Sequence, residues 1–143
     1  MIEKLKTDLL MDEGFSLHVY KDTLDNLTVG VGHLLENGED LKEDDDISWE
    51  ELWEFMRVDM MIAVGACDKL FYKWAYLPEE VQLILANMAF NLGYHRLRGF
   101  KKLAAAIFGR DYAKAAIEMK NSRWYGQVGD RSKRLVKRME LMS

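Results

Sequence analysis

The stretch from Glu13 to Leu35 constrains the fold more than any other part of the sequence. It reads EGFSLHVYKDTLDNLTVGVGHLL. Before it, apolar side chains recur with helical spacing over residues 2–12 and predict a helix. Gly14 takes a positive φ at little cost, so we expect that helix to end there, with Glu13 in its last turn.

After Gly14 the hydrophobic period changes from helical to alternating. Apolar and polar residues alternate over 15–20 and again over 27–32, which predicts two or three short strands in a small sheet. Asp25-Asn26 between the two runs is typical of a hairpin turn. We therefore expect Asp22 at the end of the first strand and Thr28 on the second. A helix end that faces such a hairpin can place the carboxylates of Glu13 and Asp22 and the hydroxyl of Thr28 on the wall of one cleft.

These residue types are the ones that cut a glycosidic bond with water. Such hydrolysis normally uses two carboxyl groups, one that protonates the departing oxygen and one that acts from the opposite face. The negative helix end and its apolar neighbours favour the protonated form of Glu13, while a polar turn keeps Asp22 ionised. Thr28 is expected to hold the attacking water with Asp22.

Each of these three residues also has a plainer interpretation. Taken alone, Glu13 is a surface acid, Asp22 a turn residue and Thr28 a β-branched strand residue. Their joint spacing and the flanking glycines favour the catalytic interpretation. The residues alone leave both retention and inversion of configuration open, because the carboxyl separation is not visible in a sequence.

The spacing also carries a family resemblance. The sequence resembles the phage-type lysozymes of the T-even-phage kind, the muramidases that phages use to open bacterial cell walls. The motifs occur in the family's order, and the spacing from Glu to Asp to Thr in the first region has no gap. The matching motifs are Glu13-Gly14, Tyr20-Lys21-Asp22-Thr23, Thr28, Gly30-Val31-Gly32-His33-Leu34, Ser122-Arg123-Trp124-Tyr125, Arg131 and Lys133-Arg134.

The resemblance implies an inverting mechanism with Glu13, Asp22 and Thr28 as the catalytic residues. It also implies that Leu34 and Phe90 line the cleft and bind substrate. Two further cleft positions of the family, a Ser and an Asn, fall on Leu103 and Glu118, so these roles are not transferred.

The implied fold is α+β and mainly helical: a lysozyme-like, two-lobed fold with a small N-terminal β-sheet lobe, a larger helical lobe, a long helix joining them and an active-site cleft between. We expect the small lobe to cover 13–58 and the helical lobe to cover 1–12 and 59–143. Ser48 and Glu51 form a capping box that predicts the start of the long helix.

The second half predicts a succession of helices. Pro78 suits the first position of a helix whose residues to Leu92 are apolar nearly all round, and such a helix is buried. Asp111 is a candidate N-cap for a helix over 112–120. Asp130 is expected to cap the last helix, 131–141, with Arg131 and the other basic residues pointing away from the core, and Trp124 and Tyr125 are interpreted as core residues.

Cysteine and histidine usage indicates no metal site or cofactor. Cys67 is the only cysteine and predicts a buried, inert thiol with no internal disulfide. Neither cysteines nor carboxylates cluster in the sequence around His18, His33 and His95, and His33 is interpreted as structural. The acidic segment 36–46 does not match the calcium-loop pattern and predicts a solvated loop.

The ends and the charge pattern suggest where the protein acts. The N-terminus lacks a signal-peptide core, and no stretch approaches the roughly 18 apolar residues of a membrane span. We expect residence in the host bacterial cytoplasm until a separate holin-like protein delivers the chain to the cell wall or periplasm.

Charge is distributed unevenly along the chain. Residues 1–80 hold 20 acidic and 7 basic side chains, whereas residues 81–143 hold 4 acidic and 13 basic side chains. This asymmetry indicates either solvated helix faces or attraction to an anionic polymer.

Three functions remain open at this point. The first is a monomeric endolysin that hydrolyses the β-1,4 bond between N-acetylmuramic acid and N-acetylglucosamine in peptidoglycan, without nucleic-acid or stable membrane association. The second is a lytic transglycosylase on the same bond, which needs the Glu but no water-positioning Asp and Thr. The third is a helical nucleic-acid-binding module that uses the basic last helix.

Overall fold

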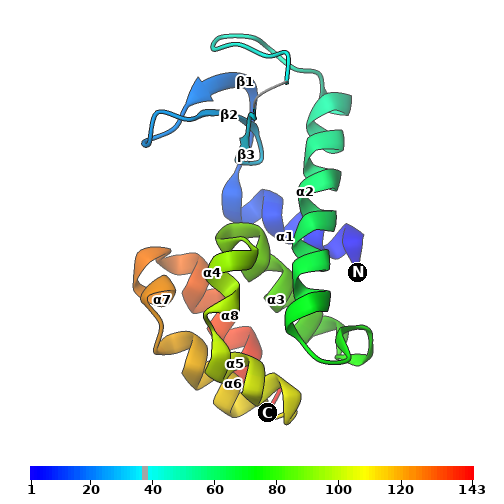
Figure 1. Cartoon of the computed structure of the whole chain (residues 1–143), viewed down its shortest axis with the longest axis vertical. Helices are drawn as coiled ribbons and strands as arrows, with labels where there is room; N and C mark the ends of the chain where they lie inside the picture. Colours follow the sequence, from blue (N-terminus) through cyan, green and yellow to red (C-terminus); the bar gives the residue numbers. More distant parts are fainter. Residues whose placement is uncertain (37–38) are drawn as a thin grey trace. The chain divides into compact units, whose positions relative to one another are not determined.

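The computed structural model describes residues 1–36 and 39–143. Within them the chain forms eight α-helices, one short 3-10 helix and one three-stranded sheet (Figure 1). The predicted α+β, mainly helical class is confirmed. The chain divides into two compact units, which we name the sheet unit (Ile2–Met61) and the helical unit (Met1 with Ile62–Ser143). The lobe boundaries expected from the sequence stay a prediction.

The sheet unit begins with the predicted helix, which runs directly into an antiparallel sheet of order β1-β2-β3 (Figure 1). Gly14 ends the helix with φ 66°, as expected of a C-cap glycine. The elements of this unit are α1 (Ile2–Glu13), β1 (Ser16–Lys21), β2 (Leu27–Gly30), β3 (His33–Leu34) and the first part of α2 (Trp49–Leu70).

The acidic segment after β3 is more ordered than a solvated loop. Residues 37–38 of the predicted loop lie outside the described residues. Beyond them the Val19 amide donates to Asp45 O at 2.8 Å, and the Ile47 amide donates to Leu17 O at the same distance. The segment therefore pairs with the outer edge of β1, a contact that its composition did not predict.

Helix α2 begins with the predicted capping box. The Ser48 hydroxyl oxygen accepts from the Glu51 amide at 3.1 Å, and the Glu51 carboxylate accepts from the Ser48 amide at 3.1 Å. The helix continues through Gly65 to Leu70 and so passes from one unit into the other.

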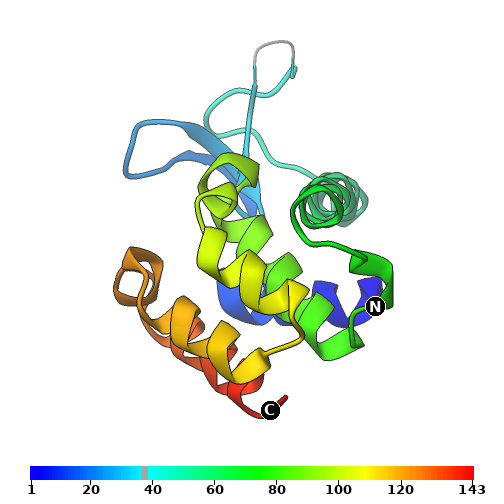
Figure 2. The same ribbon diagram turned by 60° about the horizontal axis from the view of Figure 1, so that its bottom comes forward.

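The helical unit is built around α3, on which Ile84, Leu85 and Met88 have no exposed surface. Figure 2 shows α6 packed against both α5 and α8. The elements are η1 (Trp74–Tyr76), α3 (Glu79–Leu92), α4 (Tyr94–Arg98), α5 (Lys101–Phe108), α6 (Tyr112–Lys120), α7 (Arg123–Gln127) and α8 (Asp130–Glu140).

Helix starts were predicted with mixed success. Asp111 caps α6, because its carboxylate accepts from the Lys114 amide at 3.0 Å. Pro78 is the N-cap of α3 rather than its first residue. The predicted cap of the last helix is wrong by one residue: Gly129, with φ 63°, is the N-cap, and Asp130 is already helical.

The interior of the helical unit contains a polar pair, Arg131 and Asn87, and the prediction for Arg131 is wrong. Arg131 was expected to point outward, but it is only 7% exposed. Its Nε donates to Asn87 Oδ1 at 2.8 Å and its Nη2 donates to Asn87 O at 3.1 Å. A buried guanidinium needs such acceptors, because desolvation without them is costly.

Two other expectations about buried residues are confirmed. Trp124 is a core residue, and its indole Nε1 donates to Asn91 Oδ1 at 2.8 Å. Cys67 is fully buried, and burial raises the pKa of its thiol. Every helix in the described part of the chain is too short or too polar to cross a bilayer.

Candidate active site

Glu13 is the last residue of α1, and its carboxylate lies beside the β2–β3 turn. A Cβ added to Gly32 would lie 3.8 Å from Glu13 Oε2. Gly32 has φ 66°, a conformation that side-chain-bearing residues rarely adopt. The turn can therefore pass close to the Glu13 carboxylate without a side chain between them, and the exposed Glu13 side chain remains accessible from solvent.

Asp22 directly follows β1 and opens the turn to β2. Its Oδ1 accepts from the Leu24 and Asn26 amides, both at 2.9 Å. The Asn26 backbone N–H, followed by that of Leu24 and the Asn26 side chain, holds the pKa of the Asp22 carboxyl below its ordinary value. The turn thus keeps Asp22 ionised, as its local sequence predicted.

Thr28 lies on β2 and is 3% exposed. It is paired with Tyr20 of β1 and with Leu34 of β3. Its Oγ1 donates to Asn26 O at 3.0 Å, so Asn26 contacts both Asp22 and Thr28. The sequence indicated Asn26 only as a residue of the hairpin turn and not as a partner of Asp22 and Thr28.

The four proposed site residues of the N-terminal half all belong to the sheet unit. Leu34 is half-exposed beside Thr28, where an apolar side chain can contact a sugar ring. Phe90 lies on α3 in the helical unit and is partly exposed there. The roles of these residues remain proposals.

A polar network inside the sheet unit holds β3 to the middle of α2. His33 Nδ1 lies 2.8 Å from Asp59 Oδ2, and Nε2 lies 3.0 Å from Glu39 Oε1. The ring stacks on Phe55 with 4.4 Å between centroids. The hydrogen bond to Asp59, together with the one to Glu39 and against the effect of burial, raises the pKa of His33 to about 9. These contacts fit the structural interpretation of this histidine.

A second histidine clamps the acidic segment to β1. His18 Nδ1 lies 2.8 Å from Asp46 Oδ1, and Nε2 lies 3.1 Å from Asp44 Oδ1. The bond to Asp46 and then that to Asp44 raise the pKa of His18 above its ordinary value. The sequence did not predict this clamp, because Asp44 and Asp46 lie 26 and 28 residues after His18 in the chain.

The helical unit has a cavity of about 640 Å³ of its own. Leu103 and Glu118, at the positions where the resemblance implied a Ser and an Asn, both line it. Four cations also line it, and among residues 1–36 and 39–143 none of the four forms an ion pair: Arg96, Lys101, Lys102 and Arg123.

Comparison with known proteins identifies the family of the chain. Residues 11–141 match the family model for phage lysozyme. The chain is 32% identical to a probable T4-type lysozyme 2 of Dictyostelium discoideum over 95% of this chain and 93% of that protein. It is 29% identical to the peptidoglycan hydrolase gp36 of Pseudomonas phage phiKMV over 94% of this chain and 15% of that protein. It is 28% identical to the pre-baseplate central spike protein Gp5 of Enterobacteria phage T4 over 89% of this chain and 26% of that protein. The family model covers nearly the whole chain, and the chain therefore belongs to the phage lysozyme family.

Proposed function

We propose that this protein is an endolysin that hydrolyses the β-1,4 bond between N-acetylmuramic acid and N-acetylglucosamine in peptidoglycan. The observation that carries the proposal is the single turn that joins Asp22 and Thr28 through Asn26, in the same unit as the Glu13 carboxylate. Membership of the phage lysozyme family and similarity to a named peptidoglycan hydrolase support it.

The proposed reaction uses the two carboxyl groups in different protonation states. Glu13 donates its proton to the glycosidic oxygen as the bond to the anomeric carbon breaks. A water molecule attacks that carbon from the opposite face and gives its proton to the Asp22 carboxylate. Leu34 and Phe90 contact the sugar rings. The products are a new reducing end and a free hydroxyl, with inversion at the anomeric carbon.

The presence of Asp22 and Thr28 in the site argues against the transglycosylase alternative. That reaction closes an internal anhydro ring and has no use for an activated water. Asp22 is kept ionised by two backbone N–H groups, and Thr28 offers a hydroxyl oxygen on the strand that follows the turn. These two groups are the pair that a hydrolase needs and a transglycosylase does not.

The setting of the reaction is part of the same proposal. The enzyme is a monomer that acts during phage-induced lysis, works without a cofactor and reaches the wall from the host cytoplasm with the help of a separate holin-like protein. Its substrate is the cell wall rather than nucleic acid or membrane.

The test compares wild type with Glu13→Gln on cells stripped of their outer membrane. We expect wild type to clear the suspension and to release reducing sugar ends, and Glu13→Gln to lose clearing while its unfolding transition stays close to that of wild type. Anhydro ends in the wild-type products would favour the transglycosylase. A fully active Glu13→Gln would defeat the assignment of the acid.

A further inference from the structure

Three aromatic side chains meet on the surface of the sheet unit. The ring centroids of Phe15 and Trp49 lie 5.1 Å apart, and those of Trp49 and Trp53 lie 5.9 Å apart. Phe15 is 54% exposed, Trp49 is 46% exposed and Trp53 is half-buried. We call these three residues the aromatic platform. Single exposed apolar residues are common, whereas a contiguous exposed group of them marks a binding surface.

The two tryptophans lie at the edge of the core rather than in it. Leu52, Met56 and Met60 recur every four residues along α2 and are at most 3% exposed, so they form the row that faces the core. Trp49 and Trp53 are also four residues apart and form the neighbouring row. That row reaches the surface at Trp49, and core packing therefore does not account for its ring.

The local structure on both sides holds the platform in place. The Ile47 amide donates to Leu17 O at 2.8 Å, where the acidic segment pairs with the outer edge of β1. Continued by two residues along each segment, this antiparallel register brings Phe15 next to Trp49. The capping box fixes the first turn of α2, which carries Trp49. Rings held in this way lose little conformational freedom when a ligand binds.

The chemistry of the platform fits a sugar chain. An indole has a broad apolar face, and a sugar ring has a face of C–H groups surrounded by hydroxyls. Lys6 Nζ lies 4.1 Å from the centroid of the Trp53 ring. Its ammonium group carries three N–H donors, which can reach a hydroxyl or an acetamide oxygen. Ring faces beside a donor offer a sugar both apolar contact and hydrogen bonds.

The charge of the sheet unit selects among the possible partners. This unit carries 17 acidic and 5 basic side chains. Such a surface repels nucleic acid and anionic lipid headgroups. It also opposes contact between the platforms of two copies of the chain, because both copies bring the same negative charge. The uncharged face of a sugar meets no such repulsion, so the charge favours a glycan.

We propose that the aromatic platform is a second glycan-binding surface, which holds the β-1,4-linked N-acetyl sugar strand of the cell wall through residues other than Glu13, Asp22 and Thr28. The proposal rests on the function proposed above, because it takes the same glycan as its ligand. The platform has no part in bond cleavage. It keeps the enzyme on its insoluble substrate, so that the strand near the proposed catalytic residues is met at a high effective concentration.

The first experiment titrates the Glu13→Gln protein with chitotetraose, a soluble β-1,4-linked tetramer of N-acetylglucosamine, and follows the indole N–H signals by NMR. We expect the Trp49 and Trp53 signals to shift together. The Trp74 signal should stay in place, because that side chain is 6% exposed and lies in the helical unit. The Trp49→Phe variant assigns the Trp49 signal by its absence. Unmoved Trp49 and Trp53 signals at millimolar chitotetraose would overturn the proposal.

The second experiment measures binding of the Glu13→Gln protein to purified walls by sedimentation. Adding Trp49→Gln should weaken binding by about 5- to 10-fold, whereas Trp49→Tyr keeps a ring and should retain most of it. The unfolding transition of each variant is measured alongside, and Trp49→Tyr supplies the answer if Trp49→Gln does not fold.

A pair of exposed aromatic residues in the helical unit provides the matched control. The ring centroids of Tyr72 and Phe108 lie 5.2 Å apart, and the two residues are 59% and 63% exposed. Tyr72→Ala with Phe108→Ala in the Glu13→Gln protein should leave wall binding within about twofold of its parent, since truncating an aromatic residue outside an interface costs little affinity. A loss equal to that of Trp49→Gln would show that any exposed ring binds walls, and the platform would have no specific role.

The remaining outcomes separate other occupants and the proposed function from the platform. If the platform joins two copies of the chain, the protein dimerises with rising concentration in analytical ultracentrifugation, Trp49→Gln stays monomeric and chitotetraose moves no indole signal; this result contradicts the proposal. If the proposed function is wrong, wild type releases no reducing ends from walls. If only the platform is wrong, wild type releases them and the Trp49 and Trp53 signals do not shift.

Discussion

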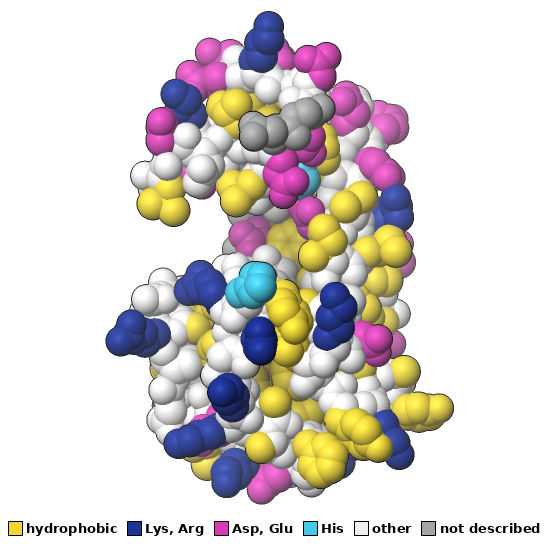
Figure 3. All heavy atoms as spheres, in the orientation of Figure 1, with side chains coloured by type: hydrophobic (Ala, Val, Ile, Leu, Met, Phe, Trp, Pro, Cys, Tyr) yellow, Lys and Arg dark blue, Asp and Glu magenta, His cyan; other side chains and the backbone are white. Residues whose placement is uncertain are grey.

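The two units of this chain are built in contrasting ways. The sheet unit carries 17 acidic and 5 basic side chains, and the helical unit carries 7 and 15. Figure 3 shows the acidic side chains gathered over the sheet unit and the lysines and arginines over the helical unit. The sheet unit is held by polar turns and histidine–carboxylate clamps, whereas the helical unit is organised around the apolar helix α3.

The difference separates the proposed catalytic residues from the main hydrophobic core. Asp22 and Thr28, proposed here as catalytic residues with Glu13, are held by hydrogen bonds within and next to a short turn. The helical unit buries the larger apolar surface, and its burial supplies most of the hydrophobic free energy of folding. Substitutions in the two units should therefore leave different signatures in activity and in unfolding.

The largest expected effect on stability lies in the helical unit. Leu85 is fully buried on α3, and Leu85→Ala removes apolar contacts and leaves a cavity, so we expect a loss of about 3 kcal/mol in the free energy of unfolding. Activity per folded molecule and its pH profile should not change. Urea unfolding and reducing-end release measure the two quantities; Tyr76→Ala, at an 82% exposed side chain of the same unit, should change neither. An altered pH profile of activity in Leu85→Ala would contradict the separation of stability in the helical unit from activity in the sheet unit.

The next effect belongs to the sheet unit and depends on pH. The folded-state pKa of His33 is raised to about 9 from an ordinary value of 6.5, so its stabilising effect is complete below the ordinary value and is lost as pH rises through the folded value. We expect wild type to lose about 1–2 kcal/mol of unfolding free energy between about pH 6 and pH 10, and His33→Gln to lack this pH-dependent loss. Denaturant unfolding at a series of pH values measures it.

His95→Gln is the control for this prediction, because His95 is exposed in the helical unit. It should follow the wild-type curve. If His33→Gln also declined over this pH range as wild type does, the His33 clamp would not be the source of the decline.

A smaller effect is expected at the start of α2. Ser48→Ala removes the acceptor for the Glu51 amide and should cost about 1 kcal/mol. Thermal unfolding measures the change. Glu50→Gln, at the next exposed acid of the same turn, should cost less, and equal costs would show that helix-end charge rather than capping matters here.

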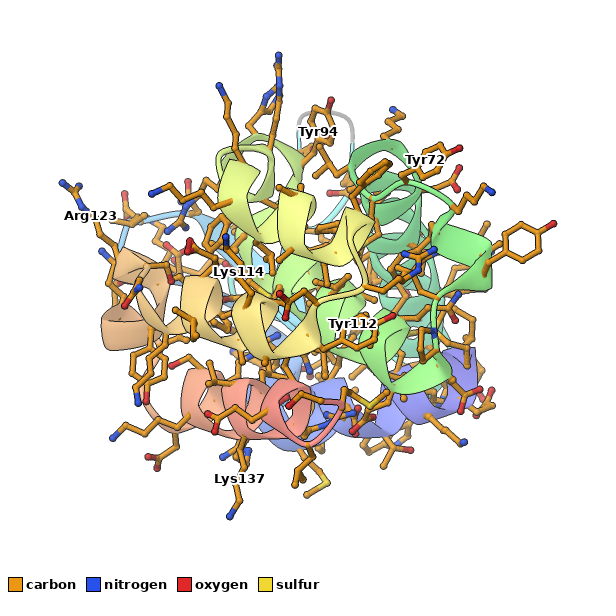
Figure 4. All side chains as sticks on the ribbon, turned by 90° about the horizontal axis from the view of Figure 1, so that it is seen from below. Tyr72, Tyr94, Tyr112, Lys114, Arg123 and Lys137 are labelled. Atoms are coloured by element: carbon orange, nitrogen blue, oxygen red, sulfur yellow. The ribbon has the colours of Figure 1, made fainter. Side chains whose placement is uncertain are left out.

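The smallest effect tests the charge of the helical unit. Figure 4 shows Arg123 extending outward from α7 and Lys137 from α8. Arg96→Gln with Arg123→Gln removes two cations from the cavity, which should weaken binding to an anionic wall polymer several-fold at low salt and less at high salt. Sedimentation with purified walls measures binding. Lys133→Gln with Lys137→Gln, on α8, should have a smaller effect; equal losses would show that net charge alone governs binding.

Local signals explain what could be predicted from the sequence. The Gly14 helix end and the Ser48–Glu51 capping box each depend on residues a few positions apart, so their patterns are visible in the chain. The alternation after Gly14 likewise predicted the sheet that contains Thr28 and whose first strand ends just before Asp22.

The errors and omissions concern contacts between distant segments. Arg131 is buried because Asn87, 44 residues earlier, supplies its acceptors. The His18 clamp depends on an acidic segment folding back on β1. Asn26 contacts Asp22 and Thr28 through its backbone groups, which every residue type carries, so the residue type gave little indication of these contacts.

We propose that Asp22 acts through a water molecule that it holds with Thr28. The most direct test is proton NMR of the sugar product within the first moments of cleavage, before the anomers equilibrate. Attack by water predicts that the new reducing end appears first as the α-anomer, inverted from the β-linked substrate. A product that appears first as the β-anomer would show retention and would contradict the account.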